Sequence, residues 1–532
     1  MRWGISFFAL SAAVIAAAWA WLGAPVTMPH APLAPGEKLY CVSYAPFRAD
    51  QTPFDPTTHI SAVQIEEDFV RLAKLTDCVR TYSVELGLDQ VPAIARRHGL
   101  KVMLGIWLSG ERDKNRIEIE TGVNLVNKYP DVVRAVVVGN EVLLRGEMSE
   151  PDLADTIRAV KTRIPASVPV TYADVWEFWL RNASLAAAVD FVTIHILPYW
   201  EDFPVPARDA ATHVDTIRRQ IAAAFPGKDI LIGEVGWPSA GRMREGALPS
   251  PANQARVIQD VLAFAKRDNV NVNVIEAFDQ PWKRALEGTV GGHWGLLDAY
   301  ARQFKFQWGE AVSNHPFWIL EAAGGVAFAM LIFGAAFASR RGEPPMRVWI
   351  AVSATAIAGG IPIGWTVANI PLESYGLGGW MRSLALAVVA LAAPPIAAAA
   401  MTAGVGVPRF SAIVGPVAWR AREPLARLAG VVLIALTLLA IQSALGLVFD
   451  PRYKDFPFAP LTAAAVPLLL LGLTVRSSGV RGAAEMIAAA VLVLSVIYIV
   501  PNEGFANWQS LWTCAALIAL AVTLARARGA KD

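Results

Sequence analysis

The sequence predicts an α/β fold, a (β/α)8 barrel over residues 36–312, followed by an all-α membrane domain over residues 317–532. Three observations lead to this prediction. Eight short apolar runs alternate with stretches of helical spacing, carboxylates and aromatic residues follow most of those runs, and the last 216 residues hold only nine Asp or Glu. The chain is 55% hydrophobic and 17% charged, which is too apolar for a soluble protein and too charged for a membrane protein throughout. A water-exposed barrel followed by an apolar membrane domain accounts for this intermediate composition.

The first predicted element is an anchor at residues 1–22, in which the apolar segment from Trp3 to Leu22 is preceded only by Arg2. About 20 apolar residues can span a bilayer. A cleaved signal peptide is the alternative, but Leu22-Gly23-Ala24 is a weak cleavage site, which favours a retained transmembrane anchor. A Pro-rich linker, residues 23–35, follows. In both cases the next domain is exported.

Strict alternation of strands and helices after the linker predicts a parallel sheet. The predicted strands lie at 38–44, 78–83, 101–108, 133–140, 169–175, 189–197, 229–235 and 272–278. The predicted helices lie at 66–75, 90–98, 116–128, 151–163, 178–188, 213–225 and 253–266. Eight repeats in about 280 residues match a TIM barrel. A doubly wound open sheet is the alternative, and the lack of a Gly-rich phosphate loop counts against its nucleotide-binding form.

Two predicted strands end on a carboxylate. One is Val136-Val137-Val138-Gly139-Asn140-Glu141, and the other is Ile230-Leu231-Ile232-Gly233-Glu234. A parallel barrel gathers the C-terminal ends of its strands at one face, where active sites form. Two facing carboxylates are what the cleavage of a glycosidic bond needs. We therefore predict Glu141 and Glu234 as the catalytic pair.

The other predicted strands end on aromatic and polar side chains, which suits a sugar ligand. Aromatic planes stack on the apolar faces of sugar rings, and carboxylates and amides bind the hydroxyl edges. For any single aromatic residue, the alternative is a cap over the core. The predicted substrate-binding residues are Tyr44, Arg80, Tyr82, Trp107, Asn140, Asp174, Trp176, His195, Tyr199, Trp237, Glu276, Asp279, Trp282 and Lys283.

Five short motifs carry a resemblance to glycoside hydrolase family 17, the β-1,3-glucanases and their transglycosylase relatives. They are Val79-Arg80-Thr81-Tyr82-Ser83, Val138-Gly139-Asn140-Glu141, Gly233-Glu234-Val235-Gly236-Trp237-Pro238, Glu276-Ala277-Phe278-Asp279-Gln280-Pro281-Trp282-Lys283 and His293-Trp294-Gly295-Leu296. Many members have Glu-Thr-Gly where this chain has Glu234-Val235-Gly236. Together with its hydrophobic second half, the chain resembles bacterial membrane-bound β-(1→6)-glucan synthases.

The resemblance implies a retaining mechanism, with Glu141 as acid/base and Glu234 as nucleophile, and no metal or cofactor. Mutual repulsion raises the pKa of one carboxyl of such a pair, and we expect it to be Glu141. Glu276 and Lys283 occupy places similar to a glutamate-lysine pair of many plant members. The implied activity is that of a β-glucan transglycosylase, which cuts β-1,3-glucan and forms β-1,6 or β-1,3 linkages in periplasmic glucan synthesis.

Two other functions stay open, an endo-β-1,3-glucan hydrolase and a catalytically idle, membrane-tethered glucan-binding scaffold. The presence of both glutamates argues against the scaffold. A synthase that uses nucleotide sugars needs a large cytoplasmic domain with acidic metal ligands, and the sequence offers neither. The expected partners are therefore a β-glucan donor and acceptor, the lipid bilayer and a separate glucan synthase that supplies the donor. No basic cluster with interleaved aromatics suggests nucleic acid.

Seven further membrane spans are predicted after the barrel, at 317–338, 348–370, 382–404, 428–448, 459–475, 483–500 and 508–525. Alternate loops hold most of the arginines: Arg340, Arg341 and Arg347, then Arg409, Arg420, Arg422 and Arg427, then Arg476 and Arg481, and in the tail Arg526, Arg528 and Lys531. The positive-inside rule places both termini in the cytoplasm. The barrel is then periplasmic, on the inner membrane of a bacterium.

Three cysteines complete the prediction. Cys41 and Cys78 lie near the starts of two consecutive predicted strands, in a compartment that permits disulfides. A disulfide and two buried free thiols are both open. Cys514 falls in a span and is expected to be inert. The seven histidines are scattered, and no metal-ligand cluster is recognisable.

Overall fold

The computed structural model describes residues 2–414, 423–475 and 482–526. Six basic residues that support the predicted topology, Arg420, Arg422, Arg476, Arg481, Arg528 and Lys531, lie outside these ranges. The chain forms two compact units. The barrel unit comprises Val26–Ala240 and Gly246–Val312, and the helical unit comprises Met1–Pro25, Gly241–Glu245 and Ser313–Asp532.

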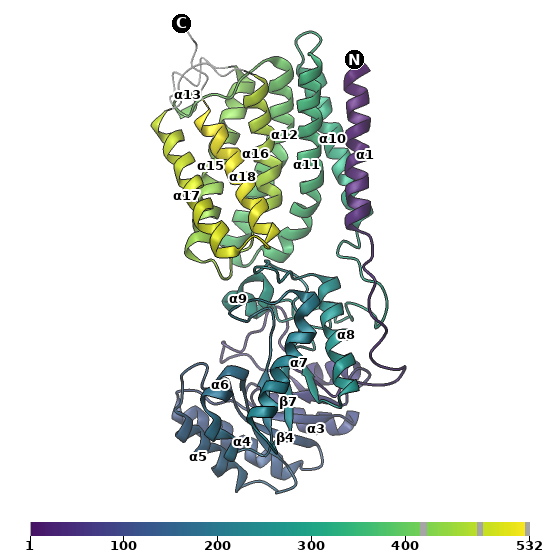
Figure 1. Ribbon diagram of the computed structural model, residues 1–532, viewed down its shortest axis with the longest axis vertical. Coiled ribbons are helices and arrows are strands. Elements are labelled where there is room, and N and C mark those ends of the chain that lie inside the picture. Colours follow the sequence, from purple (N-terminus) through teal and green to yellow (C-terminus); the bar gives the residue numbers. More distant parts are fainter. Residues whose placement is uncertain (1, 415–422, 476–481, 527–532) are drawn as a thin grey trace. The chain divides into compact units, whose positions relative to one another are not determined.

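Eight parallel strands form a closed barrel in the described part of the first unit, in the order of the sequence (Figure 1). The strands are β1 (Cys41–Ser43), β2 (Cys78–Arg80), β3 (Lys101–Ile106), β4 (Val133–Asn140), β5 (Val170–Val175), β6 (Val192–His195), β7 (Ile230–Val235) and β8 (Val272–Val274). The pairing of β1 with β8 closes the sheet. The predicted TIM barrel is thus confirmed, and the open sheet is excluded.

Helices follow the strands and cover the barrel. They are α2 (Ala62–Leu72), α3 (Val91–His98), α4 (Arg112–Lys128), α5 (Glu150–Lys161), α6 (Trp176–Arg181), α7 (Ala207–Ala224), α8 (Pro251–Arg267) and α9 (Arg284–Gly291). Ser61, Ser149 and Ser250 cap α2, α5 and α8 by accepting a hydrogen bond from a backbone N–H of the first turn. The predicted helix 178–188 is two elements, because Asn182 has a non-helical backbone between α6 and a 3-10 turn at Ala183–Ala187.

Side chains of two kinds fill the barrel. An apolar cluster joins Cys41, Cys78, Met103, Val137, Ala173 and Leu231. One step further along the strands lie buried polar groups, among them Ser43, Arg80 and Asn273. Gly233 makes room for them, since a Cβ there would meet the side chain of Thr193 at 2.3 Å. The C-terminal half of the barrel therefore has a polar interior, on which the site is built.

Cys41 and Cys78 form a disulfide, with their Cα atoms 4.4 Å apart. They are the first residues of two neighbouring strands, as the sequence allowed. The bond closes a loop over a sequence separation of 37 residues. Cys514 is a buried free thiol of the helical unit, the one free cysteine among the described residues.

Replacing both Cys41 and Cys78 by alanine is expected to destabilise the barrel by about 4 kcal/mol, because the unfolded chain regains the entropy that the closed loop had removed. Thermal unfolding of the full chain, followed by near-ultraviolet circular dichroism, measures the change. Cys514→Ala is the matched control and leaves the barrel transition in place. Equal transition temperatures for wild type and the double variant, both under oxidising conditions, contradict the prediction.

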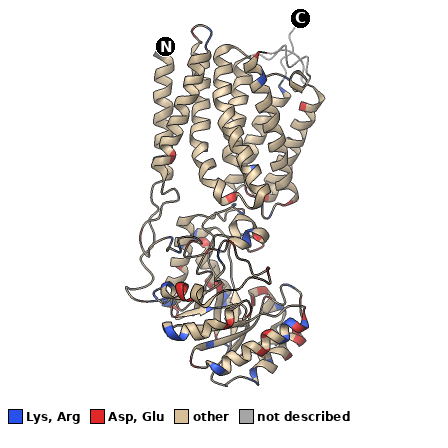
Figure 2. Cartoon of the chain, turned by 180° about the vertical axis from the view of Figure 1, so that it is seen from behind, with Lys and Arg blue, Asp and Glu red and all other residues tan. Residues whose placement is uncertain are grey.

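Apolar helices make up most of the helical unit. They are α1 (Arg2–Leu22), α10 (Trp318–Ser339), α11 (Met346–Glu373), α12 (Gly376–Ala403), α15 (Pro424–Phe449), α16 (Phe458–Thr474), α17 (Ala483–Glu503) and α18 (Trp508–Ala525), with a short α13 at Ser411–Val414. Within the described ranges, seven of them are long and apolar enough to cross a membrane, and α16 is a shorter apolar helix. Charged side chains lie mainly in the barrel and near helix ends (Figure 2). These helices fit a membrane-associated protein.

Helix α1 packs into the helical unit beside α10 and α11 (Figure 1). Ile15 and Trp19 have no exposed surface. The Ser11 hydroxyl lies 2.8 Å from that of Ser353 on α11. Gly364 accommodates the Trp19 ring, since a Cβ there would meet the ring at 2.3 Å. One face of the first helix therefore packs against α10 and α11, while most of its surface stays exposed.

Candidate active site

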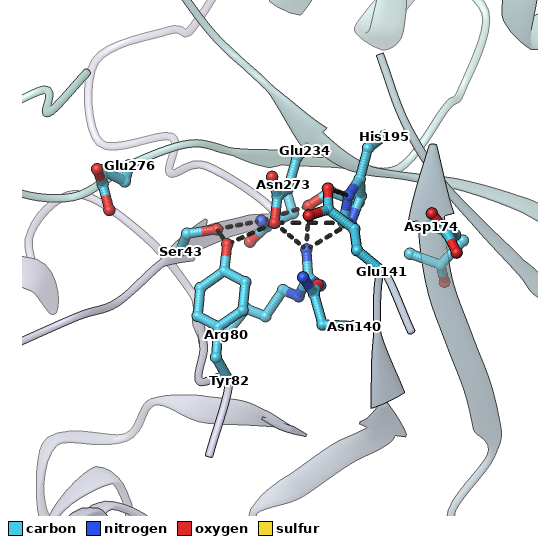
Figure 3. Close-up of polar contacts among 12 residues, drawn as sticks. Ser43, Arg80, Tyr82, Asn140, Glu141, Asp174, His195, Glu234, Asn273 and Glu276 are labelled. Carbon is cyan, nitrogen blue, oxygen red and sulfur yellow. Dashed lines mark hydrogen bonds and ion pairs between the residues drawn. The ribbon is translucent and has the colours of Figure 1, made fainter. Parts of the chain in front are cut away.

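Glu141 and Glu234 lie together at the C-terminal ends of β4 and β7 (Figure 3). One carboxylate oxygen of each, with a ring nitrogen of His195, forms a group in which all atoms lie within 4.8 Å of one another. Glu141 has a left-handed backbone with φ 52°, which follows Gly139 at φ 84°. Such a conformation is costly for a residue other than glycine, and it occurs often at functional sites. Both predicted carboxylates thus share one site.

Two donors hold the Glu234 carboxylate. The Tyr82 hydroxyl donates a hydrogen bond of 2.7 Å to Oε1, and Nη1 of Arg80 lies 3.3 Å from the same oxygen. The Glu234 side chain is 7% exposed. Burial, followed by the charge of Glu234, raises the pKa of Tyr82 well above its ordinary value. Tyr82 therefore stays a neutral hydroxyl that donates to Glu234.

Arg80 is the centre of the polar interior. Its guanidinium is fully buried and donates to the Gly233 carbonyl at 2.7 Å and to Oδ1 of Asn140 at 2.6 Å. The same group lies 4.7 Å from the centre of the Tyr82 ring. Because Arg80 engages the amide oxygen of Asn140, the amide NH₂ is the part that can donate to a sugar hydroxyl. Arg80 thus orients three neighbours of the reaction centre.

His195, at the end of β6, bridges the two glutamates. Its Nδ1 lies 2.8 Å from Glu141 Oε1, and its Nε2 lies 3.6 Å from Glu234 Oε1. Burial acts to raise the pKa of Glu141, but the hydrogen bond and charge of His195 outweigh it, so the pKa of Glu141 lies below its ordinary value. The expected rise in the pKa of Glu141 is therefore wrong. Glu141 is also the more exposed carboxylate, with a side chain 25% exposed.

Replacing His195 by asparagine is expected to raise the pKa of Glu141, because the main group that lowers it is removed. The step that needs protonated Glu141 then persists to higher pH. The basic limb of the profile of kcat/KM against pH moves upward, and the acidic limb changes less. Turnover of a β-1,3-glucan oligosaccharide, whose leaving group needs the proton of Glu141, measures both limbs from pH 4 to 9. A basic limb that stays in place or moves downward is the contrary result.

Glu276 and Lys283 form the predicted pair, with Lys283 Nζ 3.1 Å from Glu276 Oε1. Burial raises the pKa of Glu276 to about 7, and Lys283 opposes this rise. Burial acts to lower the pKa of Lys283, but the carboxylates of Glu276, Glu287 and Glu234 outweigh it, so that pKa is raised. In Figure 3, Glu276 lies to one side of the catalytic cluster. Lys283 thus stays protonated, and its positive charge interacts electrostatically with Glu234.

Three predicted aromatic residues besides Tyr82 keep exposed surface. The Trp107 ring lies 4.3 Å from the guanidinium of Arg145. The Trp176 indole donates to Glu201 at 3.3 Å. The Trp282 ring makes an edge contact with the exposed Phe54, at 5.4 Å between centroids. Each of these rings thus keeps part of its surface exposed.

Five other predicted residues are buried and have structural contacts. They are Tyr44, which donates to Asp68; Asp174, which accepts from Tyr172; Tyr199, which packs on Trp237; Trp237, which donates to the Leu248 carbonyl; and Asp279, which accepts from Lys305. Burial raises the pKa of Asp174 to about 6, and its carboxylate also accepts from the backbone N–H of Leu144, after β4, and from that of Val175, the last residue of β5. All five therefore have little exposed surface and take part in contacts within the barrel unit.

Sequence reasoning missed several residues of the site. Ser43 lies 2.8 Å from the Tyr82 hydroxyl, and Asn273 donates to Ser43 at 2.8 Å and to the Gly233 carbonyl at 2.7 Å. Both are single polar residues inside apolar strand runs, and buried polar groups need partners. Glu118 was also missed. It accepts from Ser83 and from the backbone N–H of Trp107, and burial raises its pKa to about 7.

Glu141, His195 and Glu234 offer donors that are compatible with a cation. Arg80 Nη1 lies 3.3 Å from both Glu234 Oε1 and His195 Nε2. The guanidinium is therefore already the positive partner of these donors. A metal ion would have to compete with it.

A family model described as the BtgE/BtgC glycoside hydrolase domain matches residues 41–295. "Probable beta-glucosidase btgE" of Aspergillus flavus is 30% identical over 229 residues, which are 42% of this chain and 37% of that protein. The chain thus spans little more than a third of the length of the first curated relatives it matches. "Glucan 1,3-beta-glucosidase" of Arthroderma benhamiae is 28% identical over 251 residues, or 44% of this chain and 80% of that protein.

A solved structure of a glycoside hydrolase family 17 β-1,3-glucanosyltransferase from Rhizomucor miehei is 27% identical. It covers 51% of this chain and 96% of the fungal chain, with a TM-score of 0.45. The family match contains all eight strands and both Glu141 and Glu234. Over residues 41–295 the barrel of this chain is thus similar to the BtgE/BtgC glycoside hydrolase domain.

Proposed function

We propose that this protein is a retaining β-glucan transglycosylase that cuts β-1,3-glucan and passes the fragment to an acceptor glucan. The observation that carries the proposal is the approach of the Glu141 and Glu234 carboxylates to within 4.8 Å. Retaining enzymes place these groups about 5–5.5 Å apart, and inverting enzymes about 6.5–9.5 Å. Only retention leaves a covalent intermediate that a sugar can intercept.

In the first step, a carboxylate oxygen of Glu234 attacks C1 of the sugar, while protonated Glu141 gives its proton to the leaving glycosidic oxygen. The Glu141 carboxylate lies 2.8 Å from Nδ1 of His195. In the second step, Glu141 takes the proton of an acceptor hydroxyl, whose oxygen displaces Glu234 from C1. Asn140 donates toward the 2-hydroxyl, where the contact strengthens in the transition state. The step consumes no cofactor.

The β-1,3 substrate is supported by the glucan 1,3-β-glucosidase of Arthroderma benhamiae, of which the match covers 80%. The formation of 1,6-linkages rests on the resemblance of the whole arrangement to bacterial membrane-bound glucan synthases. An endo-β-1,3-glucan hydrolase is the alternative. An idle scaffold is disfavoured by the pair of carboxylates and by the donors that orient them.

The decisive experiment is incubation of the purified full chain with a defined β-1,3-glucan oligosaccharide, followed by analysis of product length and linkage. Products longer than the substrate are expected, and new 1,6-branches support the linkage. If only shorter products form across a wide range of substrate concentrations, the protein is a hydrolase and the proposal of transglycosylation is wrong.

We further propose that the barrel works in the periplasm, anchored at a bacterial inner membrane, with α1 retained. If α16 crosses the membrane with the seven longer helices, the chain makes an even number of crossings and both termini lie in the cytoplasm. A reporter that is active only in the periplasm, fused after residue 532, should then stay silent. A signal from that fusion would mean an odd number of crossings.

A further inference from the structure

The turn that carries Glu141, residues 141–146, begins with an unfavourable backbone conformation. Glu141 directly follows β4 and is left-handed, with φ 52°. The N–H of Arg145 donates to the Glu141 carbonyl at 2.9 Å, and the left-handed Gly146 follows with φ 66°. Since a left-handed conformation is costly for glutamate, the contacts around the turn must select it.

The Arg145 side chain links this turn to the ends of two neighbouring strands. Its guanidinium donates to the carbonyl of Asn140, the last residue of β4, and to that of Leu108, two residues beyond β3, the latter at 2.8 Å. It also donates to the Glu147 carboxylate at 2.7 Å and 2.9 Å. The Arg145 side chain is 24% exposed. One guanidinium therefore joins the residue before the proposed acid/base to the segment after β3.

The Trp107 ring further restricts the position of this guanidinium, at 4.3 Å from it. The backbone of Trp107 is fixed in turn, because its N–H donates to the buried carboxylate of Glu118 at 3.2 Å. A planar guanidinium can lie on a ring and donate from its edge at the same time, whereas a lysine ammonium is a compact point charge. Arginine is thus the residue type suited to hold the Asn140 and Leu108 carbonyls together.

Strand β5 holds the turn from the opposite side, because β4 lies between β3 and β5 in the barrel. The Glu141 N–H donates to the Ala173 carbonyl at 2.8 Å, and the Leu143 N–H donates to the Tyr172 hydroxyl at 3.0 Å. Loss of the Arg145 side chain leaves these contacts in place. A variant of Arg145 is therefore expected to fold, with the turn held on one side only.

We propose that Arg145 is a positioning residue for the acid/base: by joining the Asn140 and Leu108 carbonyls, it keeps the Glu141 carboxyl aligned for proton transfer. This inference rests on the proposed function. In glycosylation, Glu141 gives its proton to the glycosidic oxygen while the bond from that oxygen to C1 breaks and an oxygen of Glu234 bonds to C1. A leaving group that departs as a stable anion needs no such proton. A displaced Glu141 therefore slows cleavage of glucan and spares cleavage of an activated glycoside.

The test compares two substrates of the full chain in lipid nanodiscs, a β-1,3-glucan oligosaccharide and a dinitrophenyl β-glycoside of the same sugar chain. Arg145→Gln is expected to lower kcat/KM for the oligosaccharide about tenfold and to keep that for the dinitrophenyl glycoside within about twofold of wild type. Equal losses on both substrates are what a merely structural role gives, and they overturn the proposal. So does an unchanged kcat/KM for the oligosaccharide.

Two further variants test whether Arg145 acts through Glu141 and through its shape. Combining Arg145→Gln with Glu141→Gln should lower oligosaccharide turnover little further than Glu141→Gln alone, because both changes affect one proton transfer. Arg145→Lys keeps the charge and should recover only part of the loss. Additive losses in the double variant, or full recovery by Arg145→Lys, contradict the proposal.

Arg134→Gln is the matched control. Arg134 lies near the start of β4, donates to the Tyr40 carbonyl at 2.9 Å and lies 4.5 Å from the centre of the Tyr40 ring. The variant thus removes contacts of the same kinds at the other end of the strand, and both substrates should keep their wild-type kcat/KM. The substrate-dependent loss of Arg145→Gln appearing in Arg134→Gln as well would mean a general effect of the barrel, against the proposal.

Hydrogen exchange of the amides of residues 141–147 gives a readout that does not depend on activity. Arg145→Gln is expected to accelerate it, and Arg134→Gln to leave it unchanged. Unchanged exchange in Arg145→Gln overturns the proposal. If wild type cleaves neither substrate, the proposed function is wrong instead, and the exchange measurement still decides whether Arg145 holds the turn.

Discussion

Glu234→Gln is expected to lower turnover of β-1,3-glucan by about 10⁴-fold or more, because the neutral amide cannot form the covalent bond to C1. The variant keeps the shape of the side chain and one oxygen to accept from Tyr82 and Arg80, so the barrel remains folded. Mass spectrometry after rapid quenching with an activated 2-fluoro-glucoside should show an adduct on wild type and none on the variant.

The matched control for this experiment is Glu66→Gln. Glu66 is a glutamate of α2 that pairs with Arg97 and His98, away from the catalytic cluster. It should retain wild-type turnover and form the adduct. If Glu234→Gln turned over glucan at the control's rate, Glu234 would not be the nucleophile.

Glu141→Gln is expected to slow turnover of natural glucan by about 10²–10⁴-fold, the range that general acid-base catalysis supplies. A substrate with a good leaving group needs no proton in the first step, so the variant should still form the glucosyl-enzyme. The second step lacks its base, so the intermediate accumulates. A burst of leaving group followed by a slow steady state, recorded by stopped-flow absorbance, is the expected signature.

The leaving-group dependence separates the two roles. For Glu141→Gln the rate should rise steeply as the leaving group becomes more acidic, whereas for Glu234→Gln it should stay low with every leaving group. The same dependence for both variants would contradict the assignment of separate duties. His195→Asn should retain adduct formation, because His195 is neither the nucleophile nor the acid/base.

The barrel and its catalytic pair could be predicted because they follow from local patterns. Alternation of strand and helix fixes the sheet as parallel, and a closed barrel then brings residues such as Glu141 and Glu234 to one end. The strand ends were less predictable. The apolar run 272–278 continues beyond β8, because Ile275 to Phe278 are also buried although they leave the strand. Burial extends that signal, together with single backbone hydrogen bonds from Ile275 to Val235 and from Ala277 to Ser43.

Contacts between distant parts of the chain escaped prediction for a physical reason. The lowered pKa of Glu141 depends on the distance of 2.8 Å to His195, which no sequence spacing encodes. Arg242 lies in a loop, where a charged residue is expected to be solvent-exposed. Instead it pairs with Glu503, which is 261 positions away in the sequence. Aromatic residues at strand ends gave mixed results. Trp107 stays partly exposed and Trp237 is buried. The exposure of each ring depends on the length and packing of the loop that carries it, which the pattern of strand ends does not specify.

The packing of α1 has a consequence for the order in which a ribosome makes the protein. Its partner helices α10 and α11 begin about 300 residues after α1 ends. At about 5–20 residues per second, translation takes about 15–60 s to reach them. During that time Ile15 and Trp19 have no partner helix, and all the barrel strands emerge before α10. The whole barrel is therefore synthesised before α10 and α11, the helices on which α1 packs.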